Sequence, residues 1–99
     1  MRRRNNWMFL LGLLAACNSP HPAFMGVQAQ EVEVQGSTFQ VRIKGDMVEV
    51  IRTNFEYVPK IGEIFPKAAA AIEIVSGCSV VPNSMKGDPA LMIAKLNCG

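Results

Sequence analysis

The chain has 99 residues, with ten lysines and arginines, eight aspartates and glutamates, and a formal net charge of +2. Three of the ten basic residues are Arg2, Arg3 and Arg4, so residues 17–99 carry seven basic against eight acidic side chains, a formal balance of −1. This balance excludes an electrostatic argument for nucleic-acid binding, which needs a clustered basic face. The length allows one small domain and no more.

The first elements along the chain are the three arginines and an apolar run from Trp7 to Ala16. This order is the pattern of a secretory signal. The run of about ten apolar residues is too short for a bilayer core, which needs roughly 20. It ends in Leu14-Ala15-Ala16-Cys17, which resembles the lipobox of a bacterial prolipoprotein.

This resemblance implies that the chain is cleaved after Ala16 and that Cys17 carries a diacylglycerol on its sulfur, often with a further acyl group on its amine. Each methylene group of an acyl chain that enters the bilayer contributes about 0.8 kcal/mol of binding free energy, so two or three chains hold a small domain on the membrane nearly permanently. Asn18 stands where inner-membrane retention signals of the enteric type carry Asp. The resemblance therefore favours the periplasmic face of the outer membrane.

A tether is predicted between the lipid and the domain. Residues 18–30 show no sustained hydrophobic period and contain Pro20, Pro22 and Gly26, which is typical of a linker. His21 lies between the two prolines and is expected to be a solvated spacer residue. We therefore expect residues 1–16 to be a signal peptide, residues 17–30 a lipidated N-terminus and flexible tether, and residues 31–99 a small α+β domain.

From Glu31 onward, apolar and polar residues alternate strictly, which is typical of strands with one buried face. Gly36-Ser37 and Gly45-Asp46 interrupt the alternation, and both are accepted hairpin loops. The pattern predicts a three-stranded antiparallel meander. Its expected pairs are Val34 with Phe39, Val32 with Val41 and Glu31 with Arg42 in the first hairpin, and Ile43 with Val48, Arg42 with Glu49 and Val41 with Val50 in the second.

This register places Arg42 between Glu31 and Glu49 on the polar face of the sheet. Paired carboxylates near a base occur in active sites, but catalysis needs burial or a cleft that shifts their pKa values. Strand positions that face water provide neither. The row is therefore predicted to be a solvated face.

Residues 53–62 are predicted to be a connection in which Phe55 and Tyr57 cover an edge of the sheet. An amphipathic helix follows, which we expect to pack on the sheet. Pro66 either opens this helix at its first turn or kinks it, and Gly77 ends it. The apolar positions, at spacings of three, four and seven, are Ile61, Ile64, Phe65, Ala68, Ile72 and Val75.

The C-terminal part is predicted to be a short disulfide-linked strand pair. The segment from Cys78 to Val81 fits a strand. Residues 90–98 fit either a buried strand, which we favour slightly, or a helix that begins at Asp88 and Pro89. With Cys17 committed to lipid, Cys78 and Cys98 remain as a pair in an oxidising compartment.

Nineteen residues lie between Cys78 and Cys98, and closing that loop stabilises the fold by about 3 kcal/mol in the chain-entropy model. The alternative is a redox pair or a metal site. Redox motifs usually place two residues between their cysteines, and no second Cys/His cluster supports a metal. A structural disulfide is therefore favoured.

No catalytic constellation is recognisable. The five serines have only His21 as a possible base, and the chain has neither a glycine-rich phosphate loop nor an HExxH motif. The sequence predicts a non-enzymatic lipoprotein, without metal or cofactor, whose small structural or interaction domain meets a periplasmic protein partner. The alternative is a small-ligand or thiol-redox role that uses Cys78 and Cys98.

Overall fold

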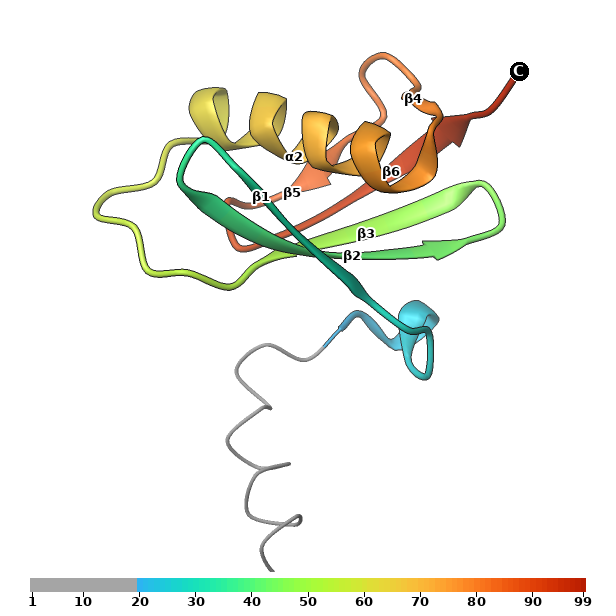
Figure 1. Ribbon diagram of the computed structural model, residues 1–99, viewed down its shortest axis with the longest axis horizontal. Helices are drawn as coiled ribbons and strands as arrows, with labels where there is room; N and C mark the ends of the chain where they lie inside the picture. Colours follow the sequence, from blue (N-terminus) through green and yellow to red (C-terminus); the bar gives the residue numbers. More distant parts are fainter. Residues whose placement is uncertain (1–19) are drawn as a thin grey trace, which may run out of the picture.

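The computed structural model describes residues 20–99 and shows an antiparallel sheet with one helix across one of its faces (Figure 1). The predicted α+β class is confirmed. In chain order the elements are η2 (Pro22–Phe24), β1 (Gln30–Val34), β2 (Ser37–Lys44), β3 (Met47–Arg52), α2 (Ile61–Ser76), β4 (Ser79–Val80), β5 (Lys86–Gly87) and β6 (Leu91–Asn97). The strands lie side by side in the order β1-β2-β3-β6-β4, and β5 pairs with β6.

The hairpin between β2 and β3 has the predicted register. Val41 lies opposite Val50, Arg42 opposite Glu49 and Ile43 opposite Val48, around a Gly45-Asp46 turn. Because side chains alternate along each strand, the valines and Ile43 share the face that carries α2. We call this face the inner face and the opposite one the outer face.

The first hairpin differs from the prediction by two residues. Val34 lies opposite Ser37, and Val32 lies opposite Phe39. The turn is therefore Gln35-Gly36 and not Gly36-Ser37; both turn residues have positive φ, 48° and 87°, as two-residue hairpin turns of type I′ require. Glu31 consequently lies opposite Gln40, so the expected pair of Glu31 with Arg42 is wrong.

Helix α2 begins at Ile61, one turn before Pro66, so the interpretation that Pro66 opens the helix is wrong. Its end is as predicted: Gly77 adopts a left-handed conformation with φ 73°, and its N–H donates to the carbonyl of Glu73. The residues of α2 that are buried against the sheet are Ile64, Ala68, Ala71 and Ile72. Two of these four are alanines, which let the helix approach the strands closely.

The C-terminal segment is a strand, β6, and it lies between β3 and β4 (Figure 1). Its buried residues Met92, Ala94 and Leu96 complete the core that Phe39, Val48 and α2 form on the inner face. Within residues 20–99, no helix is long and apolar enough to cross a membrane.

Candidate functional site

The predicted site residues fall in two groups. The predicted lipobox Leu14–Cys17, with its expected cleavage position Ala16, lies outside the described residues. Cys78 and Cys98 form a disulfide, with their Cα atoms 4.6 Å apart. It follows the end of α2 directly and joins two segments that already pair through Ser79 and Asn97, so the bridge fastens the end of the helix to the end of β6.

The outer face carries a buried polar cluster where the sequence predicted a solvated one. Glu49 is fully buried. Its carboxylate lies 3.4 Å from Nη1 of Arg42 and accepts a hydrogen bond from the backbone N–H of His21. Since no buried side-chain nitrogen or oxygen in residues 20–99 lacks a hydrogen-bond partner, the buried charge of Glu49 is compensated.

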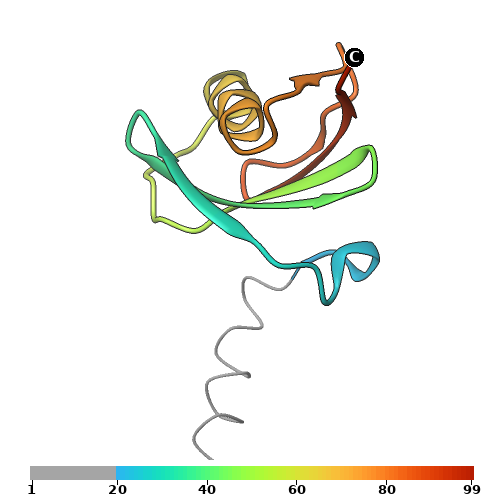
Figure 2. The ribbon, with the colours of Figure 1, turned by 45° about the vertical axis from the view of Figure 1, so that its right-hand side comes forward.

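Residues 21–27, which we call the docked segment, cover this cluster. Phe24 in η2 is only 2% exposed. Nζ of Lys44 donates to the carbonyl of Ala23 at 3.0 Å, and Nε of Arg42 donates to the carbonyl of Val27 at 3.1 Å. The part of the predicted tether from His21 to Val27 is therefore packed on the sheet, below it in Figures 1 and 2.

His21 is exposed to solvent, as expected, but it is not a free spacer residue. Its ring is exposed, but Nδ1 accepts the N–H of Ala23 and so caps η2. The sequence of β3 held a signal for this covered face. Glu49 and Ile51 both alternate with the core-facing valines of β3, and an apolar Ile51 on the outer face indicates that something covers it; the structure buries Ile51 to 3% exposure.

The second feature is the connection from β3 to α2, residues 53–60, which we call the aromatic loop. Phe55 is 88% exposed and Tyr57 is 87% exposed, and Val58 beside them is also exposed. The expectation that the two aromatic side chains cover a sheet edge is therefore wrong. In Figure 1 the loop extends beyond the end of the sheet, at the left of the view.

The aromatic loop is held in place by its polar residues, which turn toward the sheet. Glu56 accepts a hydrogen bond from the hydroxyl of Ser37, which is fully buried, and lies 3.6 Å from Nη1 of Arg52. The side-chain oxygen of Asn54 accepts the N–H of Thr38 at 2.9 Å. Glu56 thus faces inward while its two aromatic neighbours face water.

The hydrogen bond from Ser37 is the main reason why the pKa of Glu56 is lowered from its ordinary value of 4.5. Burial acts in the opposite direction, while Asn54 and the positive charges of Arg52 and Lys67 lower the pKa further. The ionised form of Glu56 is therefore the one that braces the loop.

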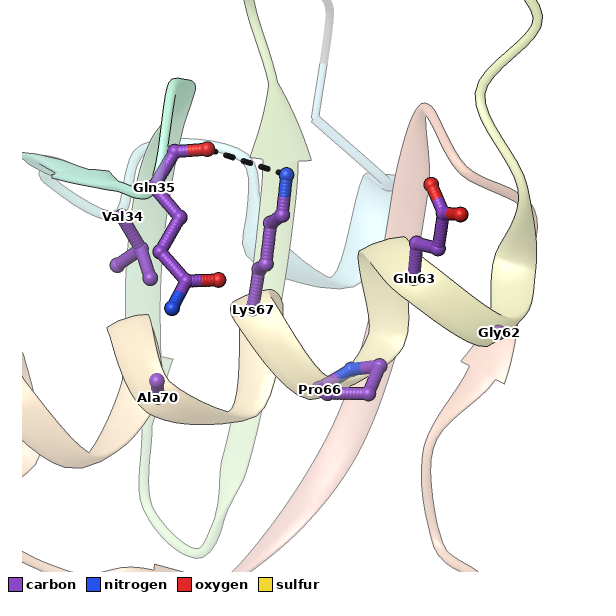
Figure 3. A pocket seen from close by; sticks show the side chains of 7 residues that line it. All are labelled: Val34, Gln35, Gly62, Glu63, Pro66, Lys67 and Ala70. Atoms are coloured by element: carbon purple, nitrogen blue, oxygen red, sulfur yellow. Dashed lines mark hydrogen bonds between the residues drawn. The ribbon is translucent and has the colours of Figure 1, made fainter.

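A hollow of about 460 Å³ lies beside the loop, between the β1–β2 turn and the first turns of α2 (Figure 3). Val34, Pro66 and Ala70 line it with apolar surface, and Gln35, Glu63 and Lys67 give it a polar rim. Nζ of Lys67 donates to the carbonyl of Gln35 at 3.1 Å and to the hydroxyl of Ser37 at 3.3 Å. Lys67 therefore connects the hollow with Ser37, the residue that bonds to Glu56 of the aromatic loop.

The aromatic loop therefore exposes apolar side chains next to polar side chains that are already held in place by hydrogen bonds. Among residues 20–99, no three His, Cys, Asp or Glu side chains are grouped so that they could hold a metal ion. No family model, curated protein or solved structure matches the chain.

Proposed function

We propose that the protein is a lipid-anchored component of the bacterial cell envelope whose non-catalytic domain binds a protein partner in the periplasm. Cys17 carries the lipid, after cleavage at Ala16, and the anchor lies in the periplasmic face of the outer membrane. The aromatic loop is the contact surface. A three-stranded meander of β1 to β3, the helix packed on it and a disulfide-linked C-terminal strand pair form the base that supports this loop.

The observation that carries the partner proposal is the direction of the side chains at positions 55 to 57. An isolated domain gains stability when it buries aromatic rings, by about 1.5–3 kcal/mol for a Phe that becomes fully buried. Here Glu56 occupies the inward position, and Phe55 and Tyr57 remain almost fully exposed. A partner that covers the two rings recovers this free energy.

The hydrogen bonds of Glu56 and Asn54 that hold the loop lower the entropic cost of such binding. A mobile loop loses conformational entropy when it binds, whereas a loop already held by hydrogen bonds loses less. Aromatic side chains are also enriched among the residues that dominate binding energy at protein interfaces. The partner expected here is a protein with an apolar pocket that accepts the rings of Phe55 and Tyr57.

The partner is tested by a photoreactive phenylalanine analogue placed at Tyr57 in cells. The matched control carries the same analogue at Ile74, which is 64% exposed on α2. We expect one discrete crosslinked protein at position 57 and none at position 74. Equal crosslinking from both positions would contradict the proposal, because it would show contact without a defined surface.

The crosslinked protein is then purified and titrated against the domain. Phe55→Ser and Tyr57→Ser should each weaken binding by roughly 30-fold, which corresponds to about 2 kcal/mol for a dominant aromatic side chain. Ile74→Ser should leave the affinity unchanged. An affinity that is the same in all three variants would exclude the aromatic loop as the contact surface.

The anchor has its own test, mass spectrometry of Cys17 in a membrane fraction. We expect a thioether-linked diacylglycerol on the first residue of the mature chain. Cys17→Ser should release the protein or leave it unprocessed. A Cys17→Ser protein that is cleaved and fractionates like the wild type would refute the anchor and leave the partner proposal to be judged separately.

A further inference from the structure

We infer that the docked segment holds the outer face of the sheet against the membrane that carries the lipid, so that helix α2 faces away from it. This inference rests on the lipid anchor proposed above. The interaction surface is the outer face with residues 21–27, and it lies against the surface of the anchoring bilayer.

The chain between the proposed lipid and the fold is short. Among residues 20–99, His21 is the first that bonds to the sheet, through its N–H and the carboxylate of Glu49. Only three residues lie between Cys17 and His21. A fully extended chain spans at most about 3.6 Å per residue, so the four steps from Cys17 to His21 span about 14 Å in all. A free tether to the start of β1 at Gln30 would instead reach about 47 Å.

The docked segment is fastened at several points along its length. Phe24 is buried, and side chains of the sheet bond to the carbonyls of Ala23 and Val27. Release of the segment would expose the apolar ring of Phe24 to water. It would also break the hydrogen bonds that Glu49, Lys44 and Arg42 make with its backbone. The short connection to the lipid is therefore maintained by the fold.

The place where the chain enters the fold decides which face meets the membrane. The docked segment lies on the outer face of the sheet, whereas α2 lies on the inner face (Figure 2). A connection of about 14 Å keeps the entry point close to the headgroups. Met25, directly after η2, is 65% exposed, and its flexible apolar side chain suits the boundary between headgroups and acyl chains.

Tryptophan fluorescence in vesicles tests this orientation. The only tryptophan in the sequence, Trp7, lies in the segment that the proposed cleavage removes. Met25→Trp and Ile74→Trp therefore each give a mature protein with one reporter, at exposed positions on opposite faces. The lipidated proteins are reconstituted into phosphatidylcholine vesicles whose acyl chains are brominated near the headgroup, because bromine quenches tryptophan on contact.

We expect a loss of emission in Met25→Trp and none in Ile74→Trp. Equal quenching in the two variants, or quenching of Ile74→Trp alone, would overturn the inference while the anchor stands. Mass spectrometry of the same samples keeps the two proposals distinguishable: a Cys17 without lipid would overturn the anchor and the inference together.

A second variant tests the role of the docked segment itself. Phe24→Ala removes the buried ring of the segment, and Phe24 lies outside the main core cluster on the inner face. Thermal unfolding checks that the domain still folds. Combined with Ile74→Trp, Phe24→Ala should produce quenching that the Ile74→Trp protein lacks, because a longer free connection lets the domain turn over. If quenching does not appear, the docked segment is not what orients the domain.

Discussion

The two faces of the sheet are covered in different ways. The inner face is covered by the 16-residue helix α2, through apolar contacts of Ile64, Ile72 and two alanines with the strands. The outer face is covered by a three-residue helical turn, η2, with one buried aromatic ring and a set of polar bonds that centre on Glu49 (Figure 2).

The inner face stabilises the fold, whereas the outer face holds the segment through which the chain enters the domain. Apolar burial is non-directional and roughly proportional to the area buried. The inner face therefore stabilises the packing of α2 on the sheet without bonds between particular atoms. The outer face depends on directed hydrogen bonds: Arg42 and Lys44 donate to backbone carbonyls of residues 21–27, and Glu49 accepts from a backbone N–H of the same segment. Those bonds fix where the chain enters the domain. We therefore expect damage to the inner face to be global and damage to the outer face to be local.

The largest expected effect is on the inner face. Phe39→Ala should lower the free energy of unfolding by about 3–5 kcal/mol, because Phe39 is fully buried against α2 and large cavities cannot be refilled. Denaturant titration measures this loss. Phe55→Ala is the matched control, since Phe55 is exposed and its loss should cost no more than about 0.5 kcal/mol. Equal losses in both variants would mean that the inner face does not carry the fold.

The next effect concerns the bridge that joins the end of α2 to the end of β6. Replacing both cysteines, Cys78→Ser with Cys98→Ser, should cost about 3 kcal/mol because the unfolded chain regains the freedom of a closed loop. The midpoint of thermal unfolding should fall as a single transition. Ser79→Ala, at the exposed neighbouring position, is the control. An unchanged midpoint in the double variant would show that the bridge adds nothing to the contact between helix and sheet.

The outer face should respond less and more locally. Glu49→Gln keeps the shape of the side chain but weakens its bonds to His21 and Arg42, at a cost of about 1.5–3 kcal/mol for hydrogen bonds to a charged group. Amide hydrogen exchange should speed up most at Phe24 and Val27. The control is Glu31→Gln, an exposed glutamate on the same face. If exchange rises equally in β2 and β3, the two faces are not separable.

The sequence predicted what depends on local pattern and missed what depends on distant contacts. The register of the β2–β3 hairpin, the end of α2 at Gly77 and the disulfide follow from alternation, a glycine and cysteine spacing. The first hairpin was displaced by two residues, and a shift of two preserves the face of every side chain, so alternation cannot detect it.

The candidate site was missed for a different reason. The burial of Glu49 is caused by a segment 28 residues earlier in the chain, and the outward direction of Phe55 and Tyr57 follows from the bond between Glu56 and a serine 19 residues away. Neither contact leaves a periodic trace in the sequence. The apolar residues Ile51 on β3 and Ile93 on β6, which share a face with Glu49, were the sequence signals that the outer face is covered.

The smallest expected effect is the acid sensitivity of the aromatic loop, which belongs to neither face. The folded pKa of Glu56 is lowered from 4.5, chiefly by the hydrogen bond from Ser37. A group whose pKa is lowered in the folded state contributes stability that is fully present above the unfolded pKa, and this contribution is lost as pH falls through the folded value. The loss therefore begins near pH 4.5 and continues below it.

Glu56→Gln should consequently have a shallower fall in stability on acidification below about pH 4.5 than the wild type. Unfolding measured at a series of pH values checks this, with Glu63→Gln, an exposed glutamate at the rim of the hollow, as the control. The same titration of wild-type protein in the partner assay should show binding weaken over this range, because protonated Glu56 no longer holds Phe55 and Tyr57 apart from the sheet. An acid slope in Glu56→Gln that equals the wild-type slope would show that Glu56 does not brace the loop.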